Sequence, residues 1–415
     1  MLGVGEAARR IVAAVAPLPP ARTALSDALG LVLAEDIRSP VALPPWDNSA
    51  MDGYAAHGDD VASASTDHPV MLPVAETIAA GGFASRPLRR GETMRIMTGA
   101  PLPQGADTVV RVEDTDGGVD SVVVRNARDR GRNVRMRGED IHEGDVVAHR
   151  GDHIGAALIG VLASVGAAAV AVHPRPRVAI MGSGDELVDL EHFDEVRAGR
   201  RIVSSNSYTL DALVRSAGAT PVPLGVAKDT PAALREKLEM ATAADLIVTS
   251  AGVSVGEHDY TRQVLDELGA EMGFWRVRMR PGAPLGFGIL RGVPWIGLPG
   301  NPVSAMVTFE LFVRPAIRRL MGHERVFPPL LDVTLAERVT TNARLTHFLR
   351  AIITADANGV RMARLTGPQG SGILTSMAKA NALIVIPEDR QSVEAGERLL
   401  AIPLRDDLAA TDLPL

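Results

Sequence analysis

The residues best suited to chemistry lie in four polar segments rich in Gly, Ser, Asn and carboxylates, each of which follows a short apolar run. These segments are 182–186, 228–229, 250–259 and 299–302. Glycine lets backbone N–H groups approach phosphate oxygens, and carboxylate oxygens suit Mg²⁺ when a phosphate completes its shell. The segments therefore indicate a site for a phosphorylated ligand and a hard cation. The alternative is that these residues only form turns and helix caps.

Patterns typical of several other catalytic classes are missing from the sequence. The chain has no Gly-Lys-Ser/Thr phosphate loop and no G-x-G-x-x-G after an apolar run. It has no cysteine, which excludes disulfides, thiolate nucleophiles and Cys-ligated metal sites. His149 and His153 are four residues apart, but Gly151-Asp152 predicts a turn between them. We therefore favour a structural role for this pair over metal binding.

The composition argues against nucleic-acid binding and membrane insertion. Lys and Arg number 43 against 50 Asp and Glu, so the net charge is −7, and aromatic residues make up only 3%. A nucleic-acid binder needs a basic surface or aromatic stacking platforms. The uncharged run 155–172 is dominated by Ala and Gly, and Gly166 predicts a helix end, so we expect a buried helix–strand pair there. The apolar stretch 11–16 is too short for a signal peptide, and we expect a cytoplasmic protein.

Strands and helices alternate between residues 177 and 322. The apolar patterns predict strands at 178–181, 220–226, 246–249 and 294–298, and helices at 207–217, 231–241, 260–268 and 303–321. This order predicts a doubly wound, mainly parallel α/β sheet, in which ligands bind beyond the carboxyl ends of the strands. The four polar segments come directly after these strands, so we expect them to share one edge of the sheet.

The flanking regions read as β structure. Residues 46–150 predict strands at 69–74, 93–97, 108–113 and 119–124, with Gly117-Gly118 as a hairpin turn. Residues 328–406 predict strands at 330–335, 348–354, 360–364 and 383–386, which is typical of a small β-barrel or sandwich. We therefore expect an α/β plus β chain of several domains.

Six motifs, in the same order along the chain, resemble those of the molybdopterin molybdenumtransferase family, which includes MoeA and the gephyrin E domain. They are Pro-Trp-Asp-Asn-Ser-Ala-Met-Asp-Gly-Tyr-Ala at 45–55, Arg-Ile-Met-Thr-Gly-Ala-Pro at 95–101, Arg-Gly-Glu-Asp-Ile at 137–141, Gly-Asp-Glu-Leu at 184–187, the segment 250–260, and Gly-Leu-Pro-Gly-Asn-Pro-Val-Ser at 297–304. The length and order of these matches make the resemblance highly specific over nearly the whole chain.

The resemblance implies an elongated chain of four domains. They are an α/β molybdopterin-binding domain (1–17 with 174–326), a small α+β linker domain (18–45 with 141–173), a β-rich domain (46–140) and a C-terminal β-barrel-like domain (327–415). It also implies a homodimer in which each active site lies between the α/β domain of one subunit and the β-rich domain of the other. The enzyme that adenylylates molybdopterin is a further candidate partner.

The resemblance also implies a reaction, in which adenylylated molybdopterin and molybdate give molybdenum cofactor and AMP in the presence of Mg²⁺. By position, Glu186, Asp229 and Asp259 hold Mg²⁺ and orient the phosphoanhydride, with Glu186 and Asp259 as the metal ligands. The partner subunit contributes Asp52, Thr98 and Asp140. The substrate-binding residues are Ser183, Gly184, Asp185, Ser250, Gly252, Ser254, Gly256, Pro299, Gly300, Asn301 and Pro302. The molybdate pocket maps to Arg280, Ala283, Arg350 and Ser371.

The chain departs from the family in that molybdate pocket. The family usually has Lys-Pro-Gly-Lys-Pro, whereas residues 280–284 read Arg-Pro-Gly-Ala-Pro, so Ala283 removes a cation from a site for a dianion. The Asp of the family's Tyr-Asp-(Ser/Thr)-Asn is also absent, since residues 203–206 read Val-Ser-Ser-Asn. These departures leave three hypotheses: an active molybdenum insertase, a paralogue that carries or scaffolds the pterin nucleotide with weak insertion, and an insertase that uses tungstate.

Overall fold

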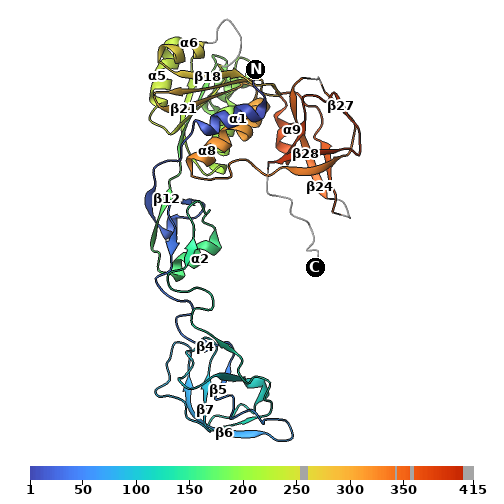
Figure 1. The fold of residues 1–415 in the computed structure, drawn as a ribbon. Coiled ribbons are helices and arrows are strands. Elements are labelled where there is room, and N and C mark those ends of the chain that lie inside the picture. Colours follow the sequence, from blue (N-terminus) through green and yellow to red (C-terminus); the bar gives the residue numbers. More distant parts are fainter. Residues whose placement is uncertain (253–259, 342–343, 356–358, 405–415) are drawn as a thin grey trace. The chain divides into compact units, whose positions relative to one another are not determined.

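The computed structural model describes residues 1–252, 260–341, 344–355 and 359–404. The described part of the chain divides into two compact units, coloured by sequence in Figure 1. The first unit contains Met1–Ala34, Gly151–Ile154 and the residues from Val170 onward, and the second contains Glu35–Arg150 and Gly155–Ala169. This division is coarser than the four predicted domains, whose boundaries stay a prediction.

The first unit is built around a sheet that confirms the predicted doubly wound α/β fold. Its strands are β13 (Arg177–Ser183), β16 (Thr220–Ala227), β17 (Leu246–Ser250), β18 (Glu271–Arg276), β20 (Pro284–Leu290) and β21 (Val293–Leu298), in the order β16-β13-β17-β21-β20-β18. The pairs β13–β16, β13–β17 and β17–β21 are parallel, and β20 and β18 add antiparallel pairs at one side. Strands β18 and β20 are absent from the sequence prediction.

Helices cover both faces of this sheet because β13 alternates its side chains between two hydrophobic cores. Val178 and Ile180 belong to one core, and Ala179 and Met181 belong to the other. The second core contains residues of α5 (Pro231–Ala241) and α6 (Tyr260–Glu267). The first core contains residues of α1 (Val4–Ala13), α4 (Ser205–Ser216), α7 (Pro302–Thr308) and α8 (Arg314–Leu320). Figure 1 shows α5 and α6 on one side of β21 and α1 and α8 on the other.

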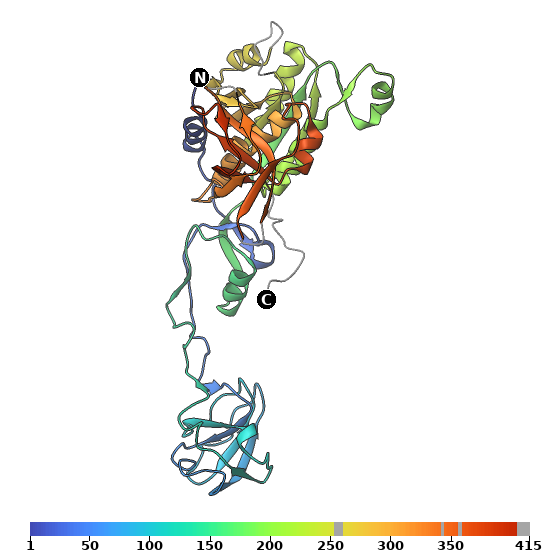
Figure 2. The ribbon, with the colours of Figure 1, turned by 90° about the vertical axis from the view of Figure 1, so that its right-hand side faces the viewer.

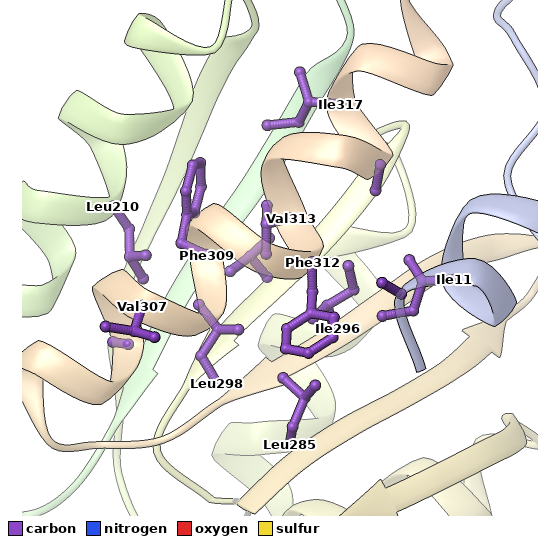
Figure 3. Packing of buried hydrophobic residues seen from close by; sticks show 14 of the residues in the cluster. Ile11, Leu210, Leu285, Ile296, Leu298, Val307, Phe309, Phe312, Val313 and Ile317 are labelled. Atoms are coloured by element: carbon purple, nitrogen blue, oxygen red, sulfur yellow. The ribbon is translucent and has the colours of Figure 1, made fainter. Parts of the chain in front are cut away.

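The long helix predicted at 303–321 forms as α7 and α8 joined by a π-helical segment, Phe309–Val313. This segment turns Phe309 and Phe312 inward, and both are fully buried. Figure 3 shows Phe312 beside Ile11 of α1, with Leu285 of the sheet below. The helix therefore anchors the N-terminal segment to the α/β sheet.

The C-terminal part of the first unit is a closed β-barrel, as expected. Its strands are β22 (Leu331–Leu335), β24 (Thr346–Ala355), β25 (Arg361–Leu365), β26 (Ala382–Ile386) and β28 (Arg398–Pro403). The ring runs β24-β25-β22-β28-β26, and pairing of β26 with β24 closes it. The short strand β19 (Met279–Arg280) leaves the α/β sheet region and pairs with β24, so it connects Arg280 to the barrel edge.

The second unit contains a sheet in the order β8-β5-β7-β6-β9, visible in blue to cyan in Figures 1 and 2. The strands are β5 (Gly53–Ala56), β6 (Val70–Ile78), β7 (Thr93–Ile96), β8 (Thr108–Arg111) and β9 (Ser121–Val124). The pairing of β8 with β9 that the predicted hairpin requires is absent, because these strands lie at opposite edges of this sheet. The chain does reverse at Gly117-Gly118, where an antiparallel bridge joins Thr115 and Val124. A 3₁₀ turn at Val112–Asp114 carries the chain away from β8 before the glycines.

The predicted helix–strand pair in 155–172 forms as α2 (Ala156–Ser164) and β12 (Ala169–His173), with Gly166 at φ +78° after the helix. The expectation that this helix is buried is wrong, since Leu162 is its only buried residue among those described. No helix in the described residues is long and apolar enough to cross a bilayer.

The remaining elements are short. They are β1 (Ala21–Ala24), β2 (Val32–Leu33), β3 (Ile37–Arg38), β4 (Asn48–Ser49), β10 (Val134–Arg135), β11 (Val146–Ala148), β14 (Leu187–Val188), α3 (Phe193–Arg197), β15 (Ile202–Val203), β23 (Val339–Thr340), α9 (Leu374–Lys379) and β27 (Ser392–Val393).

Candidate functional site

A cleft of about 450 Å³ opens at the carboxyl ends of β13, β17 and β21. Three of the four polar segments contribute to its wall, through Glu186, Ser250, Gly252 and residues 299–302. The sequence prediction that these segments meet at one sheet edge therefore agrees with the structure. Ser183 ends β13, and Gly184 and Asp185 lead from it to Glu186. Asp259, Ser254 and Gly256 lie outside the described residues.

Gly252 in this wall and Gly184 beside it occupy backbone conformations that side chains rarely adopt. Gly252 has φ +71°, and a Cβ atom there would lie 2.1 Å from Thr261 Oγ1. Gly184 has φ +146°, and a Cβ atom would lie 2.6 Å from Glu186 Oε2. The positive φ of both residues favours glycine at these positions.

Asn206, at the start of α4, joins two of the loops. Its Nδ2 donates to Ser250 Oγ at 2.7 Å and to the Gly300 carbonyl at 2.8 Å. Sequence reasoning did not count Asn206 among the site residues, although it is the last residue of the altered Val-Ser-Ser-Asn motif at 203–206. That retained amide was the signal that could have identified it.

Three carboxylates gather around the turn after β13 and the loop after β16. The Asp229 N–H donates to Asp185 Oδ1 at 3.3 Å. Partial burial, and then the negative charges of Asp185 and Glu186, raise the pKa of the Asp229 carboxyl. Such crowding of like charges favours a bound cation. The oxygen donors fit Mg²⁺, although the described residues alone contain no group of three or more metal-ligating side chains.

A second cleft, of about 420 Å³, brings Arg280 and Arg350 together between β19, β24 and the loop 365–370. The other two residues predicted for molybdate do not line it among the described residues. The Ser371 carbonyl accepts from Val303 N at the start of α7, at 3.1 Å, and the Ala283 carbonyl accepts from Val277 N at 3.0 Å. The structure thus unites two of the four predicted molybdate residues in one cleft.

Arg350 is fully buried, and its side chain is largely committed to the protein. Its Nε donates to Ser376 Oγ, its Nη1 to the Gln369 carbonyl, and its Nη2 to the carbonyls of Pro368 and Gly370, at 2.8–3.1 Å. Burial lowers the pKa of this guanidinium. A guanidinium has five N–H donors, so at least four are already used and little remains for an oxyanion. Arg280, whose side chain is exposed, is the freer cation.

The second unit holds the residues predicted to serve the partner's site. Asp52 Oδ1 accepts hydrogen bonds from both N and Oγ1 of Thr98, each at 2.7 Å. These two bonds, backbone first, lower the pKa of Asp52. Asp140 lies in the loop after β10, where its N–H donates to the Leu43 carbonyl at 3.0 Å. All three residues are exposed, and their sharing between subunits stays a prediction.

Three known domain families match the chain in series. They are the MoeA N-terminal region (domains I and II) over residues 2–166, a probable molybdopterin binding domain over 179–319, and the MoeA C-terminal region (domain IV) over 332–404. Molybdopterin molybdenumtransferase 2 of Mycobacterium tuberculosis is 41% identical over 405 residues, covering 96% of this chain and 98% of the relative. The chain belongs to the molybdopterin molybdenumtransferase family.

Other members of this family match the chain over most of its length. The molybdopterin molybdenumtransferase of Nostoc is 37% identical and that of Staphylococcus aureus 33%, over 90% and 99% of this chain and 86% and 98% of the relatives. The molybdopterin biosynthesis MoeA protein of Pyrococcus horikoshii superposes with a TM-score of 0.82 at 27% identity, covering 97% of this chain and 100% of that one. The predicted family, fold class and transferase type are thereby confirmed.

Proposed function

We propose that this molybdopterin molybdenumtransferase inserts molybdenum from molybdate into adenylylated molybdopterin and releases AMP. The observation that carries the proposal is the strand-end cleft, in which glycine-lined backbone and carboxylates meet at one sheet edge. Backbone N–H groups near Gly184 and Gly252 suit phosphate oxygens, and Asn206 holds the two sides of the cleft together. The absence of cysteine means that no protein thiolate competes with a dithiolene for the metal.

Glu186 and Asp259 would hold Mg²⁺, with Asp229 orienting the phosphoanhydride. When bound, Mg²⁺ would neutralise charge on the phosphate oxygens during cleavage. The chain's own contribution is to crowd the Asp185, Glu186 and Asp229 carboxylates, so that the site is electrostatically prepared for a cation. In the partner subunit Asp52, Thr98 and Asp140 would complete the site of a homodimer. A cytoplasmic location and contact with the adenylylating enzyme belong to the same proposal.

The test is a direct assay of AMP release and cofactor formation from adenylylated molybdopterin, with molybdate varied and tungstate run in parallel. Glu186→Gln and Asp259→Asn should each abolish AMP release while circular dichroism and oligomeric state stay unchanged. Glu236→Gln, on the exposed side of α5, makes the same charge change outside the cleft and should retain activity. Normal AMP release in both cleft variants would refute the site.

A second candidate function rests on the Arg280–Arg350 cleft. Ala283 occupies a position where the family usually has lysine, and Arg350 donates most of its N–H groups to backbone carbonyls. A protein that holds the pterin nucleotide but inserts metal poorly would have these features. In the same assay such a carrier would bind adenylylated molybdopterin tightly yet form cofactor only at high molybdate concentrations. A tungstate insertase would instead form cofactor at lower concentrations of tungstate than of molybdate.

A further inference from the structure

A basic pocket of about 410 Å³ lies in the first unit where α4, α8 and the segment after β12 meet. Its lining includes the three arginines Arg175, Arg314 and Arg318 and the two histidines His153 and His323. Within the described residues it shares no lining residue with either cleft above, and none of its lining residues is acidic. Neither the proposed reaction nor the partner-subunit residues use it.

The positive charges of the basic pocket are only partly neutralised. Arg314 Nη2 pairs with Glu310 Oε1 at 2.9 Å. Arg175, by contrast, donates to the carbonyls of Gly218 at 3.1 Å and Leu29 at 3.0 Å. Arg318 Nη2 donates to the Arg325 carbonyl at 3.1 Å. Carbonyl oxygens satisfy donors without cancelling a full charge, so the arrangement leaves net positive potential.

Arg318 also carries a buried N–H with no acceptor. Its Nε is shielded from solvent and has no hydrogen-bond partner among the described residues. Leaving a buried charged donor unsatisfied is costly, so an acceptor that enters the pocket would be stabilised. Burial, and then the charge of Arg314, lower the pKa of Arg318.

The two histidines lie together in the pocket. The rings of His153 and His323 stack with centroids 5.7 Å apart. Burial, followed by the charges of Arg318 and His153, lowers the pKa of His323 to about 4. Glu324, the next residue, lies toward Gly151 and does not line the pocket. The site is therefore short of negative charge.

We propose that the basic pocket binds a dianionic tetrahedral oxyanion, of the phosphate, phosphate-monoester or molybdate type, between Arg175 and Arg318. The planar guanidinium fork can hold two oxyanion oxygens at once. The unused Nε of Arg318 would gain an acceptor, and the anion would supply the missing counter-charge. Because α4 and α8 also pack against the α/β core, an anion here would tie these helices to the segment after β12.

The experiment is calorimetric titration of the full-length protein with inorganic phosphate, AMP and molybdate in separate arms. Arg318→Gln and Arg175→Gln should each weaken binding about tenfold or more, since each removes a charged hydrogen bond. Arg215→Gln is the matched control, because Arg215 lies on α4 next to the pocket residue Ser216 but pairs with Asp211. This variant should bind the anion as the parent does. The ligand of the basic pocket is the anion whose binding is weakened by both Arg175→Gln and Arg318→Gln.

Melting curves without anion show whether each variant is folded. If Arg318→Gln does not fold, Arg318→Lys replaces it, since lysine keeps the positive charge but loses the two-pronged guanidinium. Arg280→Gln alters only the other cleft and should leave the titration with inorganic phosphate unchanged. The proposal would be overturned by unchanged affinity for every anion in folded Arg175→Gln and Arg318 variants, or by loss of phosphate binding only in Arg280→Gln. Absence of phosphate binding to the parent at millimolar concentration, with no effect of the Arg175 and Arg318 variants on AMP or molybdate, would overturn it as well. These results are independent of whether AMP is released from adenylylated molybdopterin.

Discussion

Replacing Arg280 by glutamine should raise the molybdate requirement of cofactor formation without changing use of the pterin nucleotide. Arg280 shares its cleft with Arg350, but at least four of the Arg350 donors are bonded to Ser376 Oγ and loop carbonyls. Arg338 also lines this cleft but pairs with Glu394 at 3.1 Å, so Arg280 supplies the main available charge there among the described residues. Its strand β19 fixes it beside the barrel by pairing with His347.

The magnitude follows from one charged hydrogen bond or a bidentate pair. A hydrogen bond to a charged group contributes about 1.5–3 kcal/mol, and each ~1.4 kcal/mol is tenfold in affinity. Arg280→Gln should therefore raise the half-saturating molybdate concentration roughly ten- to a hundredfold. Arg280→Lys keeps the charge but loses the fork, so its effect should be smaller. Ala283→Lys restores the family's cation and should lower the requirement.

The assay measures cofactor formation against molybdate at fixed, saturating adenylylated molybdopterin. Arg276→Gln, an exposed arginine on β18, makes the same charge change and should behave as the parent does. A molybdate requirement that stays unchanged in Arg280→Gln would show that the oxyanion binds elsewhere. No response, or a rise, in Ala283→Lys would show that the family pocket does not apply to this chain.

The other predictions concern the strand-end cleft. Asn206→Ala removes two hydrogen bonds, so it should destabilise the fold by about 1–3 kcal/mol in urea unfolding and weaken nucleotide binding. Asn126→Ala, in the other unit, is the control. Equal losses of stability and nucleotide affinity in both variants would contradict a specific role for Asn206. Mixing inactive Asp52→Ala chains with inactive Asp259→Ala chains should restore some activity, because some mixed dimers carry one intact shared site; mixed dimers that stay inactive would contradict sharing. The raised pKa of Asp229 means that the ionised carboxyl is less favourable in the folded state than in the unfolded state, so this group's contribution to stability rises as pH falls through its folded pKa, while Mg²⁺ binding weakens. Asp229→Asn should flatten both trends in melting temperature and Mg²⁺ affinity between pH 7 and 4, and an unchanged profile would contradict this origin.

The elements that could be predicted are those with local signals. Helix α5 begins and ends where the sequence indicates, because the Thr230 side chain caps it by accepting from Ala233 N at 3.3 Å and Pro231 suits its first turn. The barrel strands β22, β24, β25 and β26 overlap the strands predicted from apolar runs, whereas β28 is absent from the sequence prediction. The strand-end position of the polar segments followed from the βαβ order alone.

Strands β18 and β20 could not be predicted, because their glycines read as turn residues. The structure gives these glycines a packing reason. A Cβ atom at Gly286 would lie 2.5 Å from the Trp295 ring, and one at Gly273 would lie 2.9 Å from the Phe287 ring. The aromatic side chains that fill this space come from other strands, so no local window contains the cause. The predicted pairing of β8 with β9 across Gly117-Gly118 also depends on distant residues, because β5, β7 and β6 lie between these two strands in the sheet.

The roles of single residues in the Arg280–Arg350 cleft also could not be predicted from the sequence. From sequence, Arg280 and Arg350 are equivalent cations, and a loss at position 283 can be offset by either. The structure separates them, because the loop 368–370 turns its carbonyls onto Arg350, which becomes a support for the cleft wall, while Arg280 stays exposed. The choice between a full insertase and a pterin-nucleotide carrier then depends chiefly on whether one guanidinium can hold a dianion that the family usually meets with two lysines and an arginine. A bidentate pair supplies two charged bonds from one side chain, which is enough for binding in the millimolar to micromolar range if both form. Arg280→Gln and Ala283→Lys therefore test the proposed function at the position where the sequence leaves it open.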